Sequence, residues 1–181
     1  MSVVVGMKFP VDVEVDSPDG PLTVSQLLGR GPVIVAFHRM WCPFCQQAAR
    51  DLVAVSDQLD EFGATVVLVY RESVEQVTMS CHDRGIPFQC VSDTARSLET
   101  AADVGRFSRT RYLAFSPARA IRALREGSHI GVGSDFLQGR GTFVLDRNGR
   151  VVYAHRSVTA ADIPSISEVV AAVQAAAQVN S

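Results

Sequence analysis

The sequence lacks a hydrophobic run long enough to cross a membrane. Its longest apolar runs, Val33 to Phe37 and Ala64 to Tyr70, are far shorter than the roughly 20 residues that a spanning helix needs. It also lacks an excess of either charge, because 17 Lys and Arg face 19 Asp and Glu, for a net charge of -2. Such a balance gives no general attraction to nucleic acid or anionic lipid. We therefore expect a protein that binds neither nucleic acid nor membrane.

Cysteine is scarce as well. Four cysteines among 181 residues are too few for a disulfide scaffold, and the first twenty residues lack a basic start followed by a long apolar stretch. The lack of such a start, together with the short apolar runs, predicts a cytoplasmic location. In such a reducing compartment, the cysteines are expected to serve redox or metal chemistry.

The chain contains no repeat, linker or low-complexity block, and we expect residues 1–181 to form a single α/β domain. Apolar runs of strand length alternate with segments of helical period, which predicts a central mixed β-sheet with helices on both faces. Strands are expected at 32–37, 64–70, 88–91, 141–146 and 150–154, the last two forming a hairpin around Asn148-Gly149. Helices are expected near 23–29, 41–62, 73–85, from Asp93, and 165–178.

Residues 105–139 follow neither period clearly. A strand at 112–115 and a basic helix at about 117–126 are expected there, followed by a glycine-rich connection. We interpret this region as an insertion over one edge of the sheet. Gly131 and Gly133 do not make a dinucleotide-binding loop, because the stretch does not join a strand to a helix. No cofactor is expected.

The main chemical motif is Trp41-Cys42-Pro43-Phe44-Cys45, placed where a buried strand ends and the longest predicted helix begins. Both sulfurs lie on the first helical turn, close enough to bond, and Pro43 suits the first helical position. Backbone amides at a helix start stabilise a thiolate, so we expect a lowered pKa for Cys42 and a higher pKa for the resolving thiol, Cys45. Simple core packing of the pair and metal binding are the alternatives.

Three neighbours of the pair are candidate supporting residues. Arg39 and His38 could supply positive potential to the thiolate, or merely end the strand in solvent. Trp41 could shield the sulfurs from water or pack as an ordinary core residue.

The other cysteines and histidines give weaker signals. Cys81-His82 and Cys90 suggest a zinc site together with the first pair, but they fall on different predicted elements, and we expect no metal. Cys90 is expected to be a small core residue and Cys81 a passive exposed thiol. His129 and His155 have no sequence partner that would complete a catalytic triad.

The segment Phe37-His38-Arg39-Met40-Trp41-Cys42-Pro43-Phe44-Cys45 resembles the thioredoxin fold, and more closely the peroxiredoxin-like branch of the AhpC/TSA family. The similarity extends over nearly the whole chain, including residues 6–10, 85–93, 154–156, 161–165 and the stretch Arg140-Gly141-Thr142-Phe143-Val144-Leu145-Asp146. It implies a thioredoxin-like fold and redox chemistry at the cysteine pair.

The resemblance also assigns roles around the pair. Peroxiredoxins place an arginine just before the hairpin strand, pointing at the reactive sulfur, and Arg140 matches it. Thioredoxins place a cis-proline there, where this chain has Gly141. The proline and threonine that peroxiredoxins carry seven and three residues before the reactive cysteine are replaced by Val35 and Arg39.

The leading hypothesis is a thiol-dependent oxidoreductase that reduces hydroperoxides. Cys42 would become a sulfenic acid, and Cys45 would condense with it to a disulfide. Its partners would be a hydroperoxide and an external reductant, either a thioredoxin-like protein or a low-molecular-weight thiol; a homodimer is compatible with this reading. The alternatives are a thioredoxin-like protein disulfide reductase and a non-enzymatic redox-sensing or zinc-binding module.

Overall fold

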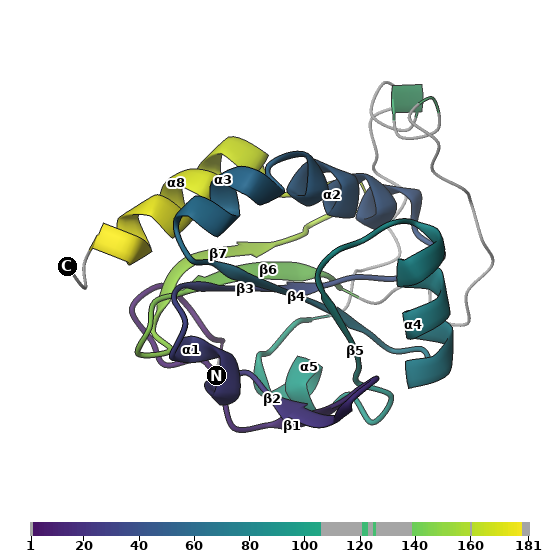
Figure 1. Cartoon of the computed structure of the whole chain (residues 1–181), viewed down its shortest axis with the longest axis horizontal. Helices are drawn as coiled ribbons and strands as arrows, with labels where there is room; N and C mark the ends of the chain where they lie inside the picture. The colour runs from purple at the N-terminus through teal and green to yellow at the C-terminus, as the bar shows by residue number, and fades with distance from the viewer. Residues whose placement is uncertain (1, 106–120, 123–124, 126–138, 160, 179–181) are drawn as a thin grey trace.

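The computed structural model describes residues 2–105, 121–122, 125, 139–159 and 161–178. These residues form a seven-stranded sheet in the order β2-β1-β5-β4-β3-β6-β7 (Figure 1). In chain order the strands are β1 (Glu14–Ser17), β2 (Gly20–Thr23), β3 (Val33–Phe37), β4 (Thr65–Tyr70), β5 (Gln89–Ser92), β6 (Gly141–Leu145) and β7 (Val151–Arg156). The predicted strand at 112–115 and helix at about 117–126 fall almost entirely outside the described residues.

The sheet is mixed, as the sequence predicts. β3 runs parallel to β4, which runs parallel to β5, whereas β6 and β7 join as an antiparallel hairpin. β6 is also antiparallel to β3, with Phe37 opposite Gly141. This register brings the residue before β6 to the end of β3, where the cysteine motif begins.

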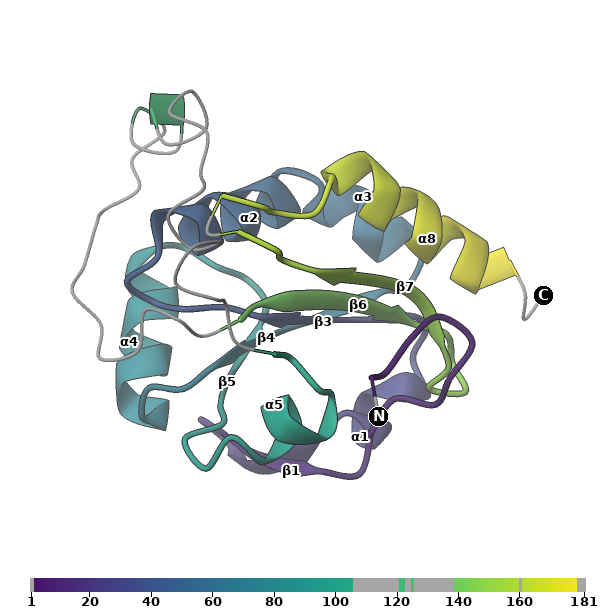
Figure 2. The same ribbon diagram turned by 180° about the vertical axis from the view of Figure 1, so that it is seen from behind.

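Helices cover both faces of the sheet (Figures 1 and 2). On one side lie α2 (Pro43–Ala54), α3 (Ser56–Glu61), α4 (Val74–Asp83) and α8 (Ile166–Gln178), which share an apolar core with the sheet. On the other side, α1 (Ser25–Leu28) and α5 (Ser97–Ala101) pack on a second core that includes Phe37 and Phe143. The sheet strands at the centre are buried on both faces, which explains their continuous apolar runs.

The capping signals are confirmed in part. Ser73 and Gln76 form the predicted capping box at the start of α4, and Asp93 accepts backbone N–H groups at the start of α5. At α1 only half of the predicted box forms, because Gln26 accepts the Thr23 N–H while the Thr23 side chain pairs with Ser25.

One expectation was wrong in detail and another was incomplete. The predicted helix at 41–62 is divided into α2 and α3 at Val55, whose ψ of 14° leaves the helical range. The hairpin of β1 and β2, which turns through Asp19-Gly20, was predicted only as a turn, because four-residue strands at a sheet edge give little periodic signal. In the described part of the chain, every helix falls short of the length and apolar character that a membrane crossing requires.

Candidate active site

The cysteine pair lies at the end of β3 and the start of α2. Cys42 is the N-cap residue in an extended conformation, and Pro43 occupies the first turn, as predicted. Cys45 lies one turn further on, and both thiols are free and buried. The abrupt change from strand to helix therefore places two reduced sulfurs side by side in the protein interior.

Arg140 reaches both sulfurs from the neighbouring strand. Its Nη1 lies 3.2 Å from Cys42 Sγ and 3.5 Å from Cys45 Sγ, and its Nη2 donates to the Thr159 carbonyl at 3.0 Å. The side chain is only 5% exposed, which excludes a surface arginine in a loop. Gly141 begins β6 directly after it, and a Cβ there would lie 3.2 Å from the Phe143 ring. Arg140 therefore lies against both sulfurs of the pair.

The two thiols are hydrogen-bonded to each other, so the ionisation of one depends on the other. The hydrogen bond to Cys45, burial and the neighbouring Cys45 charge together raise the pKa of Cys42 well above its ordinary value. Burial opposes ionisation of Cys45 too, but the Cys42 hydrogen bond and the Arg140 charge outweigh it and lower the pKa of Cys45 well below its ordinary value. The two sulfurs thus titrate as a pair, and the first negative charge of the pair lies beside the Arg140 guanidinium. The prediction of a lowered Cys42 pKa did not count the hydrogen bond between the two thiols, which opposes ionisation of Cys42.

Arg39 is buried rather than in solvent. Its backbone N–H donates to Cys45 Sγ at 3.2 Å, and its guanidinium forms an ion pair with Glu99 at 2.9 Å. The charge of Arg39 is therefore directed away from the sulfurs, and its amide is the group that faces them. A hydrogen bond to the charged form favours ionisation.

His38 and Trp41 complete the surroundings of the pair. His38 is buried, and burial together with the charges of Arg140 and Arg39 lowers its pKa despite the opposing Cys45 charge, so the imidazole is neutral at neutral pH. Trp41 is half-buried against a cluster formed by the two cysteines, Phe44 and Ala161. Trp41 therefore packs against the cluster that contains both sulfurs.

A pocket of about 350 Å³ opens beside α2, next to the sulfur cluster. Phe44 and Ala161 belong to both, so the pocket and the cysteine pair share a wall. Its remaining lining residues are both apolar and polar: Ile163, Pro164 and Ile166, and Gln47, Asp51, Arg122 and Ser165.

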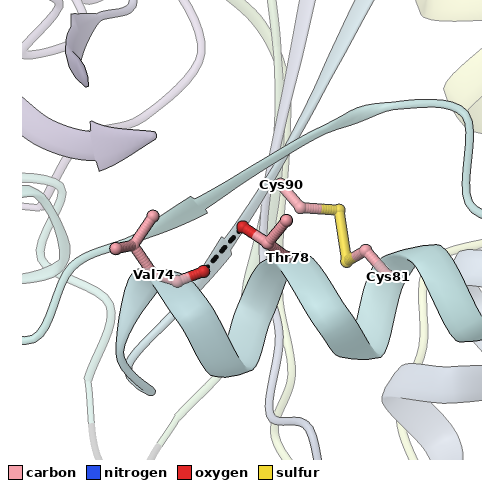
Figure 3. Close-up of a disulfide and its surroundings, with 4 residues drawn as sticks. All are labelled: Val74, Thr78, Cys81 and Cys90. Atoms are coloured by element: carbon pink, nitrogen blue, oxygen red, sulfur yellow. Dashed lines mark hydrogen bonds between the residues drawn. A yellow bond between two sulfur atoms is a disulfide. The ribbon is translucent and has the colours of Figure 1, made fainter. Parts of the chain in front are cut away.

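The other two cysteines form a disulfide. Cys81 on α4 and Cys90 on β5 are bonded and buried (Figure 3), so the prediction of a passive exposed thiol at Cys81 was wrong. Their positions nine residues apart carry no local signal, since only the packing of α4 on β5 brings them together. In the described residues no group of His, Cys, Asp and Glu is arranged to hold a metal ion.

Sequence reasoning missed two further partners. Glu99, the buried carboxylate that binds Arg39, lies sixty positions away from it, and a single glutamate in a short helix gives no pattern. His155 has an acidic partner after all, since its Nε2 lies 3.2 Å from Asp162 Oδ1. His129 lies outside the described residues.

Comparison with known structures gives the same fold over almost the whole chain. A bacterioferritin comigratory protein from Xanthomonas campestris, studied for alkyl peroxide reduction, is 23% identical with a TM-score of 0.70, covering 96% of this chain and 99% of its own. A PrxQ mutant from Xylella fastidiosa is 20% identical with a TM-score of 0.71, covering 97% and 98%.

Peroxidoxin BcpB from Mycobacterium tuberculosis is 19% identical with a TM-score of 0.69, covering 94% of this chain and 96% of its own. The search of curated proteins found no match. The AhpC/TSA family model matches residues 5–154, which include both cysteines of the pair and Arg140. This chain belongs to the AhpC/TSA family.

Proposed function

We propose that the protein is a thiol-dependent peroxidase that reduces hydroperoxides at the Cys42–Cys45 pair. The observation that carries the proposal is a buried arginine placed against both sulfurs of a pair that shares one proton. Arg140 can stabilise a thiolate and, in the same position, the negative charge that develops on peroxide oxygen as the O–O bond breaks. Family membership and the named activity of the X. campestris protein agree with it.

In the first step a thiolate attacks the peroxide. Transfer of the shared proton from Cys42 to Cys45 puts the charge on Cys42, the sulfur nearer Arg140 Nη1. Cys42 then attacks the terminal peroxide oxygen, the O–O bond breaks, and the alkoxide leaves and takes a proton from water. Cys42 becomes a sulfenic acid, two electrons pass to the peroxide, and the product is an alcohol, or water if the substrate is hydrogen peroxide.

In the second step the Cys45 thiol attacks the Cys42 sulfenic acid. A sulfur–sulfur bond forms, and the hydroxyl leaves with the Cys45 proton as water. The motif allows this without unwinding of α2, since the sulfurs are already in contact through a hydrogen bond. An external thiol, either a thioredoxin-like protein or a low-molecular-weight thiol, then returns both sulfurs to the reduced state.

The test measures peroxide consumption by purified protein with an added thiol reductant. Cys42→Ser and Cys45→Ser are each expected to abolish turnover. The two variants should differ in the oxidised product, because only Cys45→Ser, which keeps Cys42, should accumulate a sulfenic acid. Unchanged turnover in Cys42→Ser would refute the proposal. Insulin reduction without peroxide consumption would instead establish a protein disulfide reductase.

We also propose a cytoplasmic location, because the catalytic cycle needs a steady supply of thiol reductant, which reducing compartments hold. The homodimer stays a prediction, and size-exclusion chromatography with light scattering tests it.

A further inference from the structure

Glu99 is a buried carboxylate that binds several arginines outside the sulfur pair. It is 2% exposed, and a carboxylate this deep requires charged or hydrogen-bonding partners. Its Oε2 accepts from Arg39 Nη2 at 2.9 Å and Arg71 Nε at 3.2 Å, and its Oε1 accepts from Arg96 Nη2 at 3.2 Å. None of these atoms takes part in the chemistry proposed above.

Of these arginines, Arg39 contacts the active site directly. Its Nη1 donates to the His38 carbonyl at 2.7 Å, and its Nη2 also donates to the Gly139 carbonyl at 3.3 Å. Its own backbone N–H donates to Cys45 Sγ at 3.2 Å. Gly139 immediately precedes Arg140. The Arg39 guanidinium therefore binds two backbone carbonyls, those of His38 and Gly139. Each carbonyl lies next in sequence to a residue that contacts the sulfurs, Arg39 itself through its amide and Arg140 through its guanidinium.

The carboxylate itself is held in place by the end of the sheet. Asp93 follows β5, and its backbone N–H donates to the Tyr70 carbonyl at 2.7 Å. Its carboxylate accepts the Ser97 and Glu99 N–H groups at 2.8 and 2.9 Å. The start of α5 is thus fixed to the ends of β4 and β5, which gives Glu99 a rigid base.

We propose that Glu99 is a positioning residue for the sulfur pair: it fixes the Arg39 guanidinium, and through it the Arg39 amide that contacts Cys45 and the Gly139 carbonyl before Arg140. The proposal deepens the proposed function, since it concerns the same two sulfurs. It differs from a purely electrostatic role, in which Glu99 would act only as a negative charge near the thiolate.

The two roles predict opposite effects when the charge of Glu99 is removed. Loss of a nearby negative charge favours a thiolate and would lower the pKa of Cys45. Loss of position withdraws the Arg39 amide and shifts Arg140, and would raise the pKa of Cys45 because a hydrogen bond to the charged form is lost. The direction of the change in the Cys45 pKa therefore separates the two roles. If Glu99 served only to stabilise the fold, its replacement would leave the Cys45 pKa unchanged.

The experiment titrates the thiolate of the reduced protein by its ultraviolet absorbance. Glu99→Gln removes the charge and keeps the shape, while Glu99→Asp keeps the charge and shortens the side chain. Both variants are expected to raise the titration midpoint by about one pH unit. Glu72→Gln is the matched control, because the Glu72 carboxylate accepts the Arg71 backbone N–H and does not contact Arg39; its midpoint should equal or fall below that of the parent.

A midpoint that falls or stays constant in Glu99→Gln would overturn the proposal. If that variant does not fold, as judged by its thermal unfolding, Glu99→Asp decides: a raised midpoint supports the proposal and a parental one overturns it. The titration needs no peroxide. Failure of this proposal is therefore distinguishable from failure of the proposed function, which would appear as absent turnover in the parent.

Discussion

The two cysteine pairs of this protein are equally buried and chemically opposite. Cys42 and Cys45 are free thiols that share a proton and face the Arg140 guanidinium. Cys81 and Cys90 are joined, and they pack in an apolar cluster with Tyr70 and Val77. Burial alone therefore does not decide what a cysteine does. The neighbouring charges and hydrogen-bond donors decide it, because they determine whether a buried thiolate is stable.

The charge beside the first pair has the largest expected effect. Arg140→Met removes the guanidinium that contacts both sulfurs. It should lower the rate of peroxide reduction by about a hundredfold or more, as for the loss of one donor to a developing oxyanion. It should also raise the thiolate titration midpoint. Arg147→Met, on the exposed turn between β6 and β7, is the control. If Arg140→Met reduced peroxide as fast as the parent protein, the neighbouring guanidinium would not be what makes the first cysteine pair reactive.

The second pair should matter for stability and not for turnover. Its bond closes a loop between residues nine apart, for which chain entropy gives about 2.6 kcal/mol of stabilisation. The double variant Cys81→Ala, Cys90→Ala should lose about that much free energy of unfolding in denaturant, with peroxide consumption retained. The control is the parent protein with its disulfide reduced, which lacks the bond but keeps the cysteine side-chain atoms that the double variant has lost. Loss of turnover with a native unfolding curve would instead give the second pair a redox role.

The pH dependence of stability gives the smallest effect. In the reduced protein the lowered Cys45 pKa contributes stability that is present above the ordinary thiol pKa of about 8.5 and is lost as pH falls through the folded value. The raised Cys42 pKa contributes stability that is present below about 8.5 and is lost at higher pH.

The free energy of unfolding, relative to a Cys42→Ala, Cys45→Ala double variant under the same reducing conditions, should therefore be greatest near pH 8.5, at about the ordinary thiol value. Cys81 and Cys90 are reduced in both proteins, so their contribution to the free energy of unfolding cancels in the difference. A difference that does not vary with pH would contradict the opposed ionisation of the first pair.

The sequence predicts what depends on neighbouring residues in the chain. The central strands, the Asn148-Gly149 hairpin, the Ser73 capping box and Pro43 at the start of α2 all follow from local patterns, and the structure confirms them. Arg140 was found through the resemblance of the strand that follows it.

What the sequence does not predict depends on contacts across the fold. Glu99 meets Arg39 across sixty positions, and Cys81 meets Cys90 only after α4 packs on β5. The helix start predicts a stabilised thiolate, but the Arg39 amide and the Cys42 thiol, which both contact Cys45, are brought there by the fold. Such three-dimensional hydrogen bonds leave no periodic signal.

The central claim is that peroxide converts the Cys42–Cys45 pair, and no other cysteine pair, from thiols to a disulfide. Peptide mapping by mass spectrometry, after brief exposure of the protein to one equivalent of hydrogen peroxide, tests it most directly. We predict a new Cys42–Cys45 bond with the Cys81–Cys90 bond unchanged. Persistence of both free thiols, or a bond from Cys42 or Cys45 to Cys81 or Cys90, would contradict the account.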